Sequence, residues 1–270
     1  MIIAQITDTH IALDAPDAGR RLSDFVLTVA DINALDPLPD AIVHTGDIAH
    51  NGLPEEYAEA AAVLAKAKAP VYVLAGNKDD RANLREAFAA GGYIPGSGFI
   101  QYAIDGFPVR LIALDTQSSS NKGDFCPERL RHLNELIKAE TTKPIAVFAH
   151  HPPFIVTEGP DAIHFDDQQI MSTLVGALHH SGRVAAVFSG HVHRAASGDV
   201  AGIPASVMPA TATTLRHGKY PAELKNRPVY HVHRFDPACG FVTETRIAGR
   251  TGASHSKPST MRLSAVRSAT

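Results

Sequence analysis

The sequence predicts an α/β fold on three observations. Short apolar runs rich in β-branched residues end in polar residues, helical patterns separate many of these runs, and the late strands have no helix between them. Near-continuous apolar runs are typical of strands buried on both faces of a sheet. The predicted strands cover residues 2–7, 41–45, 71–75, 109–114, 145–149 and 184–189. Alternation of such strands with helices favours α/β layers.

Four segments between these strands have the pattern of helices. Residues 22–35 place apolar side chains at close to helical spacing. Residues 54–68 begin with Pro and two Glu and end in Lys, a polarity that suits the helix dipole. Residues 128–139 and 166–180 are the other two predicted helices.

The last part of the chain changes character. Residues 198–208 and 229–247 are predicted to form strands joined by turns, and antiparallel strands at one side of the sheet are the simplest interpretation. Residues 249–270 are rich in Ser, Thr, Arg and Gly with little apolar pattern, which predicts a disordered or loosely docked tail. No internal repeat or linker interrupts the rest, so we expect one domain over residues 1–248.

Composition excludes several classes of protein. The 270 residues are 44% hydrophobic and 20% charged, which is enough apolar material for a sizeable core. A net charge of −3 provides no general basic surface for a nucleic acid polymer or an anionic membrane. Two cysteines, Cys126 and Cys239, cannot form a disulfide framework or a cysteine-rich zinc site. The start of the chain does not resemble a signal peptide, so we expect a cytoplasmic location and no membrane partner.

The unusual number is 15 histidines, and several of them follow predicted strands. Ligands bind just beyond the carboxyl ends of strands in open α/β sheets, so polar residues at five strand ends are expected to meet at one place. These ends read Asp8-Thr9-His10, Gly46-Asp47, Gly76-Asn77-Lys78, His150-His151 and Gly190-His191-Val192-His193.

The residue types at these ends indicate a metal centre. They offer imidazoles, carboxylates and one amide oxygen without a thiolate, a mixture that suits Mn, Fe(II), Co or Zn. Seven candidate ligands are too many for one tetrahedral ion and suit two ions that share a carboxylate. The seven are Asp8, His10, Asp47, Asn77, His150, His191 and His193.

The ordered pattern D-x-H, G-D, G-N, H and G-H-x-H resembles the calcineurin-like metallophosphoesterases over roughly the first three quarters of the chain. The residues around these motifs look like those of the bacterial phosphodiesterase branch. The segments concerned are Ile-Thr-Asp-Thr-His, Thr-Gly-Asp-Ile and His-His-Pro-Pro. That branch includes glycerophosphodiesterases and class III cyclic-nucleotide phosphodiesterases. The resemblance implies a four-layered α-β-β-α sandwich.

The resemblance also implies roles for the seven residues. Asp8, His10 and His193 would hold the first divalent ion, and Asp47 would bridge the two ions. The second ion would be held by Asn77, His150 and His191. A metal-bound hydroxide would then attack phosphorus in line with the leaving oxygen.

One position departs from the family pattern. Family members usually read G-N-H at the third motif, where this chain has Lys78. A lysine can supply positive charge to a phosphate oxygen but is a poorer general acid near neutral pH. We therefore expect Lys78 to bind and polarise the substrate, with His151 or His217 as alternative sources of the acid.

Other residues are predicted to support the site or the core. Asn51 and Arg81 follow the second and third motifs and are candidates for contact with a phosphate oxygen. His164 and His217 lie in loops that can reach the rim of the site. His231 and His233 form a further H-x-H, but they fall in an alternating strand without a glycine turn, so we predict a structural role.

The sequence therefore predicts a dinuclear phosphodiesterase for a glycerophosphodiester or a 3′,5′-cyclic nucleotide. A phosphomonoesterase of the same superfamily and a non-catalytic metal-binding scaffold are the alternatives. A DNA nuclease is disfavoured because the chain is net acidic and has no basic extension. By analogy with the family, a homo-oligomer is plausible.

Overall fold

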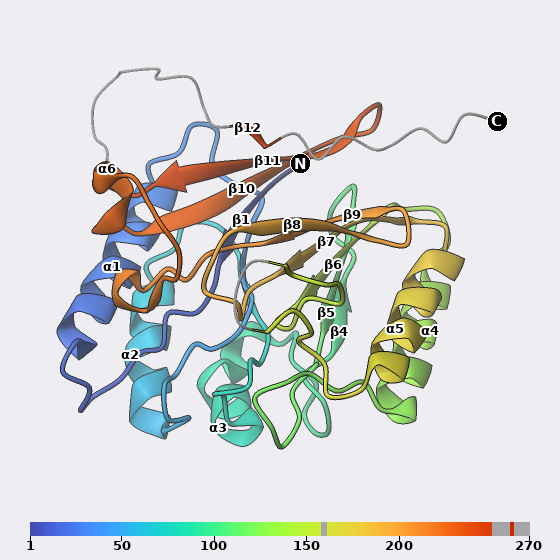
Figure 1. Cartoon of the computed structure of the whole chain (residues 1–270), viewed down its shortest axis with the longest axis horizontal. Coiled ribbons are helices and arrows are strands. Elements are labelled where there is room, and N and C mark those ends of the chain that lie inside the picture. The colour runs from blue at the N-terminus through green and yellow to red at the C-terminus, as the bar shows by residue number, and fades with distance from the viewer. Residues whose placement is uncertain (158–160, 250–259, 262–270) are drawn as a thin grey trace.

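The computed structural model describes residues 1–157, 161–249 and 260–261. Two six-stranded sheets face each other, and helices cover the outer face of each (Figure 1). This arrangement confirms the expected α-β-β-α layering. Most of the predicted tail, residues 250–259 and 262–270, lies outside the described residues.

The first sheet combines the first three and the last three strands of the chain. Its order is β12-β11-β10-β1-β2-β3, with β1, β2 and β3 parallel and β10 antiparallel to β1. Its strands are β1 (Ile2–Ile6), β2 (Ala41–His44), β3 (Val71–Val73), β10 (Val229–Asp236), β11 (Gly240–Ile247) and β12 (Thr260–Met261). The helices on this side are α1 (Ala18–Ile32), α2 (Pro54–Leu64) and α3 (Arg81–Ala87).

The second sheet has the order β4-β5-β6-β7-β9-β8, with β5, β6, β7 and β9 parallel. Its strands are β4 (Tyr102–Ile104), β5 (Arg110–Leu114), β6 (Ile145–Ala149), β7 (Val184–Ser189), β8 (Ala196–Val200) and β9 (Ile203–Val207). The helices α4 (Pro127–Ala139) and α5 (Gln168–His180) cover it. Short helical segments are η1 (Ala89–Gly91), η2 (Thr213–Leu215) and α6 (Ala222–Lys225).

The continuous apolar strands are explained by burial on both faces. In β6, Phe148 packs in the core shared with the first sheet, whereas Val147 packs with the residues of α4 and α5. Phe188 on β7 joins Phe148, with ring centroids 5.3 Å apart. Each strand therefore needs apolar side chains at successive positions, because alternate residues point to opposite faces.

One expectation needs correction, and one helix was not predicted. The late strands do not lie at one side of a single sheet: β8 and β9 extend the second sheet, whereas β10 and β11 extend the first. Helix α3 was not expected, because its seven residues are too short for a periodic signal. It is fixed locally by Asp80, whose side chain accepts hydrogen bonds from the backbone N–H groups of Ala82 and Asn83.

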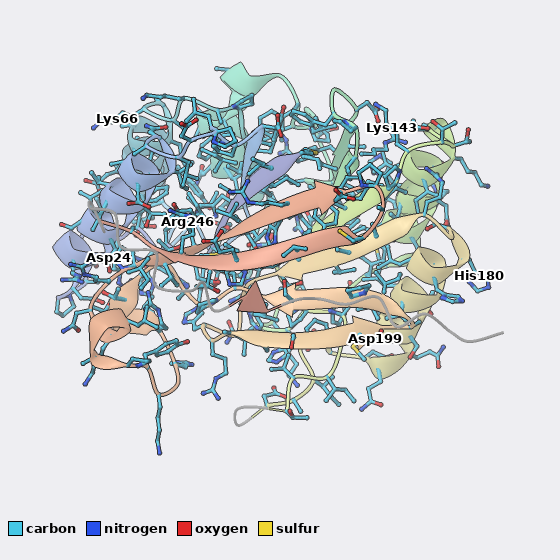
Figure 2. The ribbon with its side chains drawn as sticks, turned by 90° about the horizontal axis from the view of Figure 1, so that it is seen from above. Asp24, Lys66, Lys143, His180, Asp199 and Arg246 are labelled. Atoms are coloured by element: carbon cyan, nitrogen blue, oxygen red, sulfur yellow. The ribbon has the colours of Figure 1, made fainter. Side chains whose placement is uncertain are left out.

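The helical layers lie at opposite ends of the molecule. Figure 2 shows this from above, with Asp24 of α1 at one end and His180 of α5 at the other. Among the described residues, none of the helices combines the length and hydropathy that crossing a bilayer requires.

Candidate metal centre

The predicted ligands meet beyond the strand ends in two groups. The first consists of Asp8, His10, Asp47 and His193, and the second contains His150, His151 and His191. Within each group, the candidate ligand atoms all lie within 4.8 Å of one another. The Asn77 amide oxygen joins the second group, 3.1 Å from His150 Nε2 and 3.0 Å from His191 Nδ1.

The first group brings nitrogen and carboxylate atoms to a single point. The Nε2 atoms of His10 and His193 are 3.1 Å apart, and His193 Nε2 is 3.3 Å from Asp8 Oδ1. That carboxylate oxygen is buried and has no hydrogen-bond partner among the described residues. An unpartnered buried carboxylate oxygen beside two imidazoles fits a divalent cation, since an unpaired polar atom is otherwise costly to bury.

Asp47 connects the two groups. Its Oδ2 lies 3.4 Å from His10 Nε2 in the first group and 3.5 Å from His150 Nε2 in the second. Its other oxygen, Oδ1, accepts a hydrogen bond of 2.8 Å from the backbone N–H of Lys78. The carboxylate therefore lies between the two groups, with one oxygen facing both and the other held by the backbone.

Backbone strain is concentrated at these residues. Six non-glycine residues among those described have a positive φ, and five of them belong to the predicted ligand set. The five are Asp8 (50°), His10 (43°), Asp47 (51°), His191 (71°) and His193 (58°). This conformation is unfavourable for L-residues with side chains, and it clusters at functional sites where surrounding structure enforces it.

Glycines in the motifs allow the strand ends to approach closely. Gly46 has φ 92°, and a Cβ there would lie 2.6 Å from Gly76 N and 2.8 Å from His150 Nδ1. At Gly190, a Cβ would collide with Thr7 Oγ1 and lie 2.8 Å from Asp8 Oδ2. The glycines before Asp47 and His191 are therefore required by packing of the ligand-bearing turns.

Hydrogen bonds to the backbone orient two of the imidazoles. His150 Nδ1 donates to the Thr45 carbonyl at 2.9 Å, and His193 Nδ1 donates to the Leu215 carbonyl at 3.0 Å. In both rings, Nε2 is then the nitrogen that faces the candidate ligand atoms, Asp47 Oδ2 for His150 and Asp8 Oδ1 for His193. When one ring nitrogen of a metal-binding histidine donates a hydrogen bond to the protein, that bond sets the tautomer and the orientation of the ring.

The charges of the ligands are set by burial and by one another. Burial raises the pKa of Asp47, but attraction to His150 outweighs it and holds the pKa well below its usual range. Burial lowers the pKa of His150, yet its pairing with Asp47 and Asp8 raises the pKa overall to about 9. Burial lowers the pKa of His10 to about 4. A cation bound here would compete with the proton for His150, so metal affinity is expected to depend on pH.

Asp79 supports the site, although no role was predicted for it. Its buried carboxylate accepts hydrogen bonds from the backbone N–H groups of Ile48, Ala49 and Gly76 and from the Tyr57 hydroxyl. These contacts hold the turn that carries Asp47. Burial, with the nearby charge of Asp47, raises the pKa of Asp79 to about 7. The sequence feature that could have indicated a role for Asp79 is its position two residues after Asn77.

Non-ligand histidines flank most of the ligand histidines. Ring centroids are 5.6 Å apart for His50 and His10, 5.4 Å for His217 and His193, and 5.1 Å for His164 and His191. His164 and His217 were expected at the rim, whereas His50 was not expected. His50 lies three residues after Asp47, and that spacing was the signal available in the sequence.

The predicted substrate residues differ in their surroundings. Lys78 and His217 are exposed at the site. The Asn51 amide donates to Glu56 Oε1 at 2.9 Å, and Arg81 makes two hydrogen bonds of 2.7 Å to the Asp115 carboxylate. His151 is fully buried, with Nδ1 2.8 Å from Thr116 Oγ1 and Nε2 3.3 Å from the Asn121 carbonyl. These three side chains are therefore held by protein partners, and their contact with a substrate stays a prediction.

Relatives in sequence cover most of the chain. A probable glycerophosphodiester phosphodiesterase GpdQ of Arcobacter nitrofigilis is 29% identical over 93% of this chain and 94% of its own length. A probable cyclic nucleotide phosphodiesterase of Rhodopseudomonas palustris is 32% identical over 74% of each chain. A cAMP/cGMP dual specificity phosphodiesterase of Mycobacterium tuberculosis is 30% identical over 79% of this chain and 68% of its own length. These names confirm the predicted resemblance to the bacterial phosphodiesterase branch.

Solved structures agree on the fold. The purple acid phosphatase PPD1 of yellow lupin superposes with a TM-score of 0.65 at 13% identity, over 94% of this chain and 52% of that one. GAP50 of Plasmodium gives a TM-score of 0.64 at 13% identity, over 99% of this chain and 89% of that one. The family model described as calcineurin-like phosphoesterase matches residues 1–195, which carry all seven predicted ligands. With this match, the two-sheet fold and the motifs at its strand ends, the chain belongs to the calcineurin-like phosphoesterase family.

Proposed function

We propose that this protein hydrolyses small phosphodiesters at a centre of two divalent ions. The observation that carries the proposal is the position of Asp47 Oδ2, within 3.5 Å of an imidazole nitrogen in each ligand group. The phosphodiesterase names of relatives that match over most of the chain support a diester as the substrate. Glycerophosphodiesters and 3′,5′-cyclic nucleotides are the two candidate classes.

The proposal assigns each ligand to one ion or to both. Asp8, His10 and His193 would hold the first, Asn77, His150 and His191 the second, and Asp47 would be shared. When bound, ions of this type supply Lewis acidity toward phosphoryl oxygens and acidify water. The chain itself orients the imidazoles through Thr45 and Leu215 and holds Asp47 through the Lys78 backbone.

Lys78 is proposed to bind the substrate rather than to protonate the leaving group. It is exposed and directly follows Asn77, so its ammonium group is free to contact a phosphoryl oxygen. Turnover would then favour substrates whose leaving group needs little protonation. The exposed His217, beside His193, is the other candidate for proton donation in this part of the site.

The test of the function is a panel of phosphoesters with metal-free protein reconstituted with Mn, Fe(II), Co or Zn. We expect about two ions per chain and faster hydrolysis of bis(nitrophenyl) phosphate than of nitrophenyl phosphate. Asp47→Asn should abolish most activity, whereas His132→Ala on α4 serves as a matched histidine control. A preference for the monoester would favour a phosphomonoesterase, and a metal-free, inert protein would favour a scaffold.

The role of Lys78 has its own test. Lys78→His should raise activity on diesters with poor leaving groups, such as alkyl esters, more than on nitrophenyl esters. Lys78→Met removes the charge and should raise KM for both. Equal effects of Lys78→His on both classes of ester would contradict the proposed division of roles. Location in the cytoplasm and homo-oligomerisation stay predictions.

A further inference from the structure

A buried side-chain amide connects the two sheets directly behind the ligand groups. Gln5 lies on β1 and is fully buried. Its Nε2 lies 3.0 Å from Thr45 Oγ1 and 3.0 Å from the Ser189 carbonyl oxygen, and its Oε1 lies 3.0 Å from His233 Nε2. Thr45 follows β2 of the first sheet, whereas Ser189 ends β7 of the second. A single amide therefore contacts both sheets.

The chemistry of the donors and acceptors fixes this arrangement. The Ser189 carbonyl can only accept, so the amide nitrogen of Gln5 must face it. The Gln5 oxygen must then accept from His233, which places the proton on His233 Nε2. His233 Nδ1, 2.8 Å from Thr243 Oγ1, accepts from that hydroxyl. Every polar atom of Gln5 and of the His233 ring is thus satisfied by one pattern of protons.

The residues that Gln5 holds directly precede candidate ligands. Thr45 is followed by Gly46 and Asp47, and its carbonyl also accepts the hydrogen bond from His150 Nδ1. Ser189 is followed by Gly190 and His191. The amide therefore sets the distance between the turn that carries Asp47 and the turn that carries His191 and His193.

His231 provides an internal comparison on the same strand. It lies on β10 two residues before His233, is directly opposite Gln5 in the strand pairing, and is 4% exposed. Neither of its ring nitrogens has a hydrogen-bond partner within the part of the chain that the structure describes. Burial alone therefore does not explain the contacts of His233, which also stacks on Phe188 with ring centroids 3.8 Å apart.

We propose that Gln5, oriented by His233, is a positioning residue that holds the two ligand groups at the separation needed to share two ions. The inference rests on the proposed dinuclear function and extends it to residues outside the ligand set. Contacts to groups that carry metal ligands typically change metal affinity or activity by about 10- to 100-fold when they are lost.

The experiment compares three variants of the full chain. His233→Phe keeps an aromatic ring against Phe188 and removes both hydrogen bonds, and Gln5→Met keeps the approximate shape of the side chain without its amide. His231→Phe is the matched control, because it removes from the same strand a buried imidazole that has no hydrogen bond to any described residue. Mn²⁺ affinity is measured by calorimetry on chelator-treated protein, and the visible spectrum of the Co²⁺ form reports ligand geometry.

We expect His233→Phe and Gln5→Met to weaken Mn²⁺ binding by about 10- to 100-fold and to alter the Co²⁺ spectrum. His231→Phe should stay within about twofold of wild type, a difference of less than about 0.5 kcal/mol. Circular dichroism and thermal unfolding of the metal-free proteins establish that each variant is folded, and Gln5→Met carries the test if His233→Phe does not fold.

Folded variants of Gln5 and His233 with wild-type Mn²⁺ affinity would overturn the inference, as would equal weakening by His231→Phe. Wild-type protein that binds two ions and hydrolyses the diester in the same experiments supports the proposed function independently of these variants. Wild-type protein that binds no metal overturns both the proposed function and the inference.

Discussion

The tetrapeptide His-Val-His-Arg occurs twice in this chain, at residues 191–194 and at residues 231–234. The first copy lies in a turn after β7 and supplies two candidate metal ligands. The second lies inside β10, where both histidines are buried between the sheets. Identical local sequence therefore has two different outcomes, and the difference lies in the backbone.

The residues before each copy determine that backbone. Gly190 permits the close approach to Thr7 and Asp8, and His191 and His193 then adopt positive φ values of 71° and 58°. Tyr230 continues a strand instead, and strand alternation places His231 and His233 on one face. An H-x-H spacing alone does not identify a metal site; the strand end and the glycine before it do.

His193 of the first copy also differs from both histidines of the second copy in the direction of its pKa shift. Burial lowers the pKa of His193, but attraction to Asp8 raises it overall. Burial lowers the pKa of His231 to about 4 and holds that of His233 well below its usual range. Attraction to Asp8 therefore raises the pKa of His193, whereas burial lowers the pKa of His191 in the same copy as it does in the second copy.

The largest contrast is expected from removing one histidine of each copy. His193→Ala should lower metal-dependent diesterase activity on the order of a thousandfold, because electrostatic stabilisation by a bound ion is worth several kcal/mol. His231→Phe should leave activity within about threefold of wild type. Initial rates on bis(nitrophenyl) phosphate with added Mn²⁺ measure both, and comparable losses would show that the two copies are not functionally distinct.

The pH dependence of stability sharpens the contrast. In the unfolded chain the pKa of His231 is about 6.5, whereas in the folded chain it is about 4. As the pH falls between these two values, His231 binds a proton in the unfolded chain but not in the folded chain. The free energy of unfolding should fall over this range, with His231 contributing up to about 3 kcal/mol. His193, with its raised pKa, contributes stability that is present below pH 6.5 and lost as pH rises through its folded pKa.

Urea unfolding of the metal-free protein at pH 7, 6, 5 and 4 measures this dependence. His231→Phe should flatten the acid slope relative to wild type. An unchanged slope in His231→Phe would mean that His231 binds its proton equally well in the folded and the unfolded chain, contrary to the lowered pKa.

Gly190→Ala tests the turn directly. The added Cβ would meet Thr7 Oγ1 and Asp8 Oδ2, so the turn must shift at a cost of about 1–3 kcal/mol in unfolding free energy and with weaker Mn²⁺ binding. Gly176→Ala in α5 is the matched control, since its Cβ would meet nothing within 4 Å and alanine favours a helix. Wild-type metal affinity in a folded Gly190→Ala variant would contradict the packing explanation.

The smallest expected difference is in the unfolding free energies of variants at the valine of each His-Val-His-Arg copy. Val232 is fully buried, and Val232→Ala should cost about 2 kcal/mol from lost apolar burial and the cavity that remains. Val192 is only partly buried, so Val192→Ala should cost less than about 1 kcal/mol. Urea unfolding of both variants at neutral pH measures the difference, and a larger loss at Val192 would mean that the turn is packed more tightly than its exposure indicates.

Much of the fold and the set of candidate ligands could be predicted from the chain alone. Buried parallel strands require continuous apolar runs, and the polar residues that end such runs were therefore visible, including Asp8, Asp47 and Asn77. Helix α3 and the separate sheets of the two late hairpins could not be predicted, because short elements and strand pairing depend on distant partners.

The sequence by itself determined the layered α/β class, the family motifs and the strand ends at which ligands gather, because these depend on the order and polarity of residues. The tertiary structure alone decided that Asp47 lies between the two ligand groups and that Gln5 joins Thr45 to Ser189. These outcomes require atoms from strands as far apart as β1 and β7 to meet within hydrogen-bonding distance. Such distances cannot be predicted from local sequence, since the packing of the two sheets sets them.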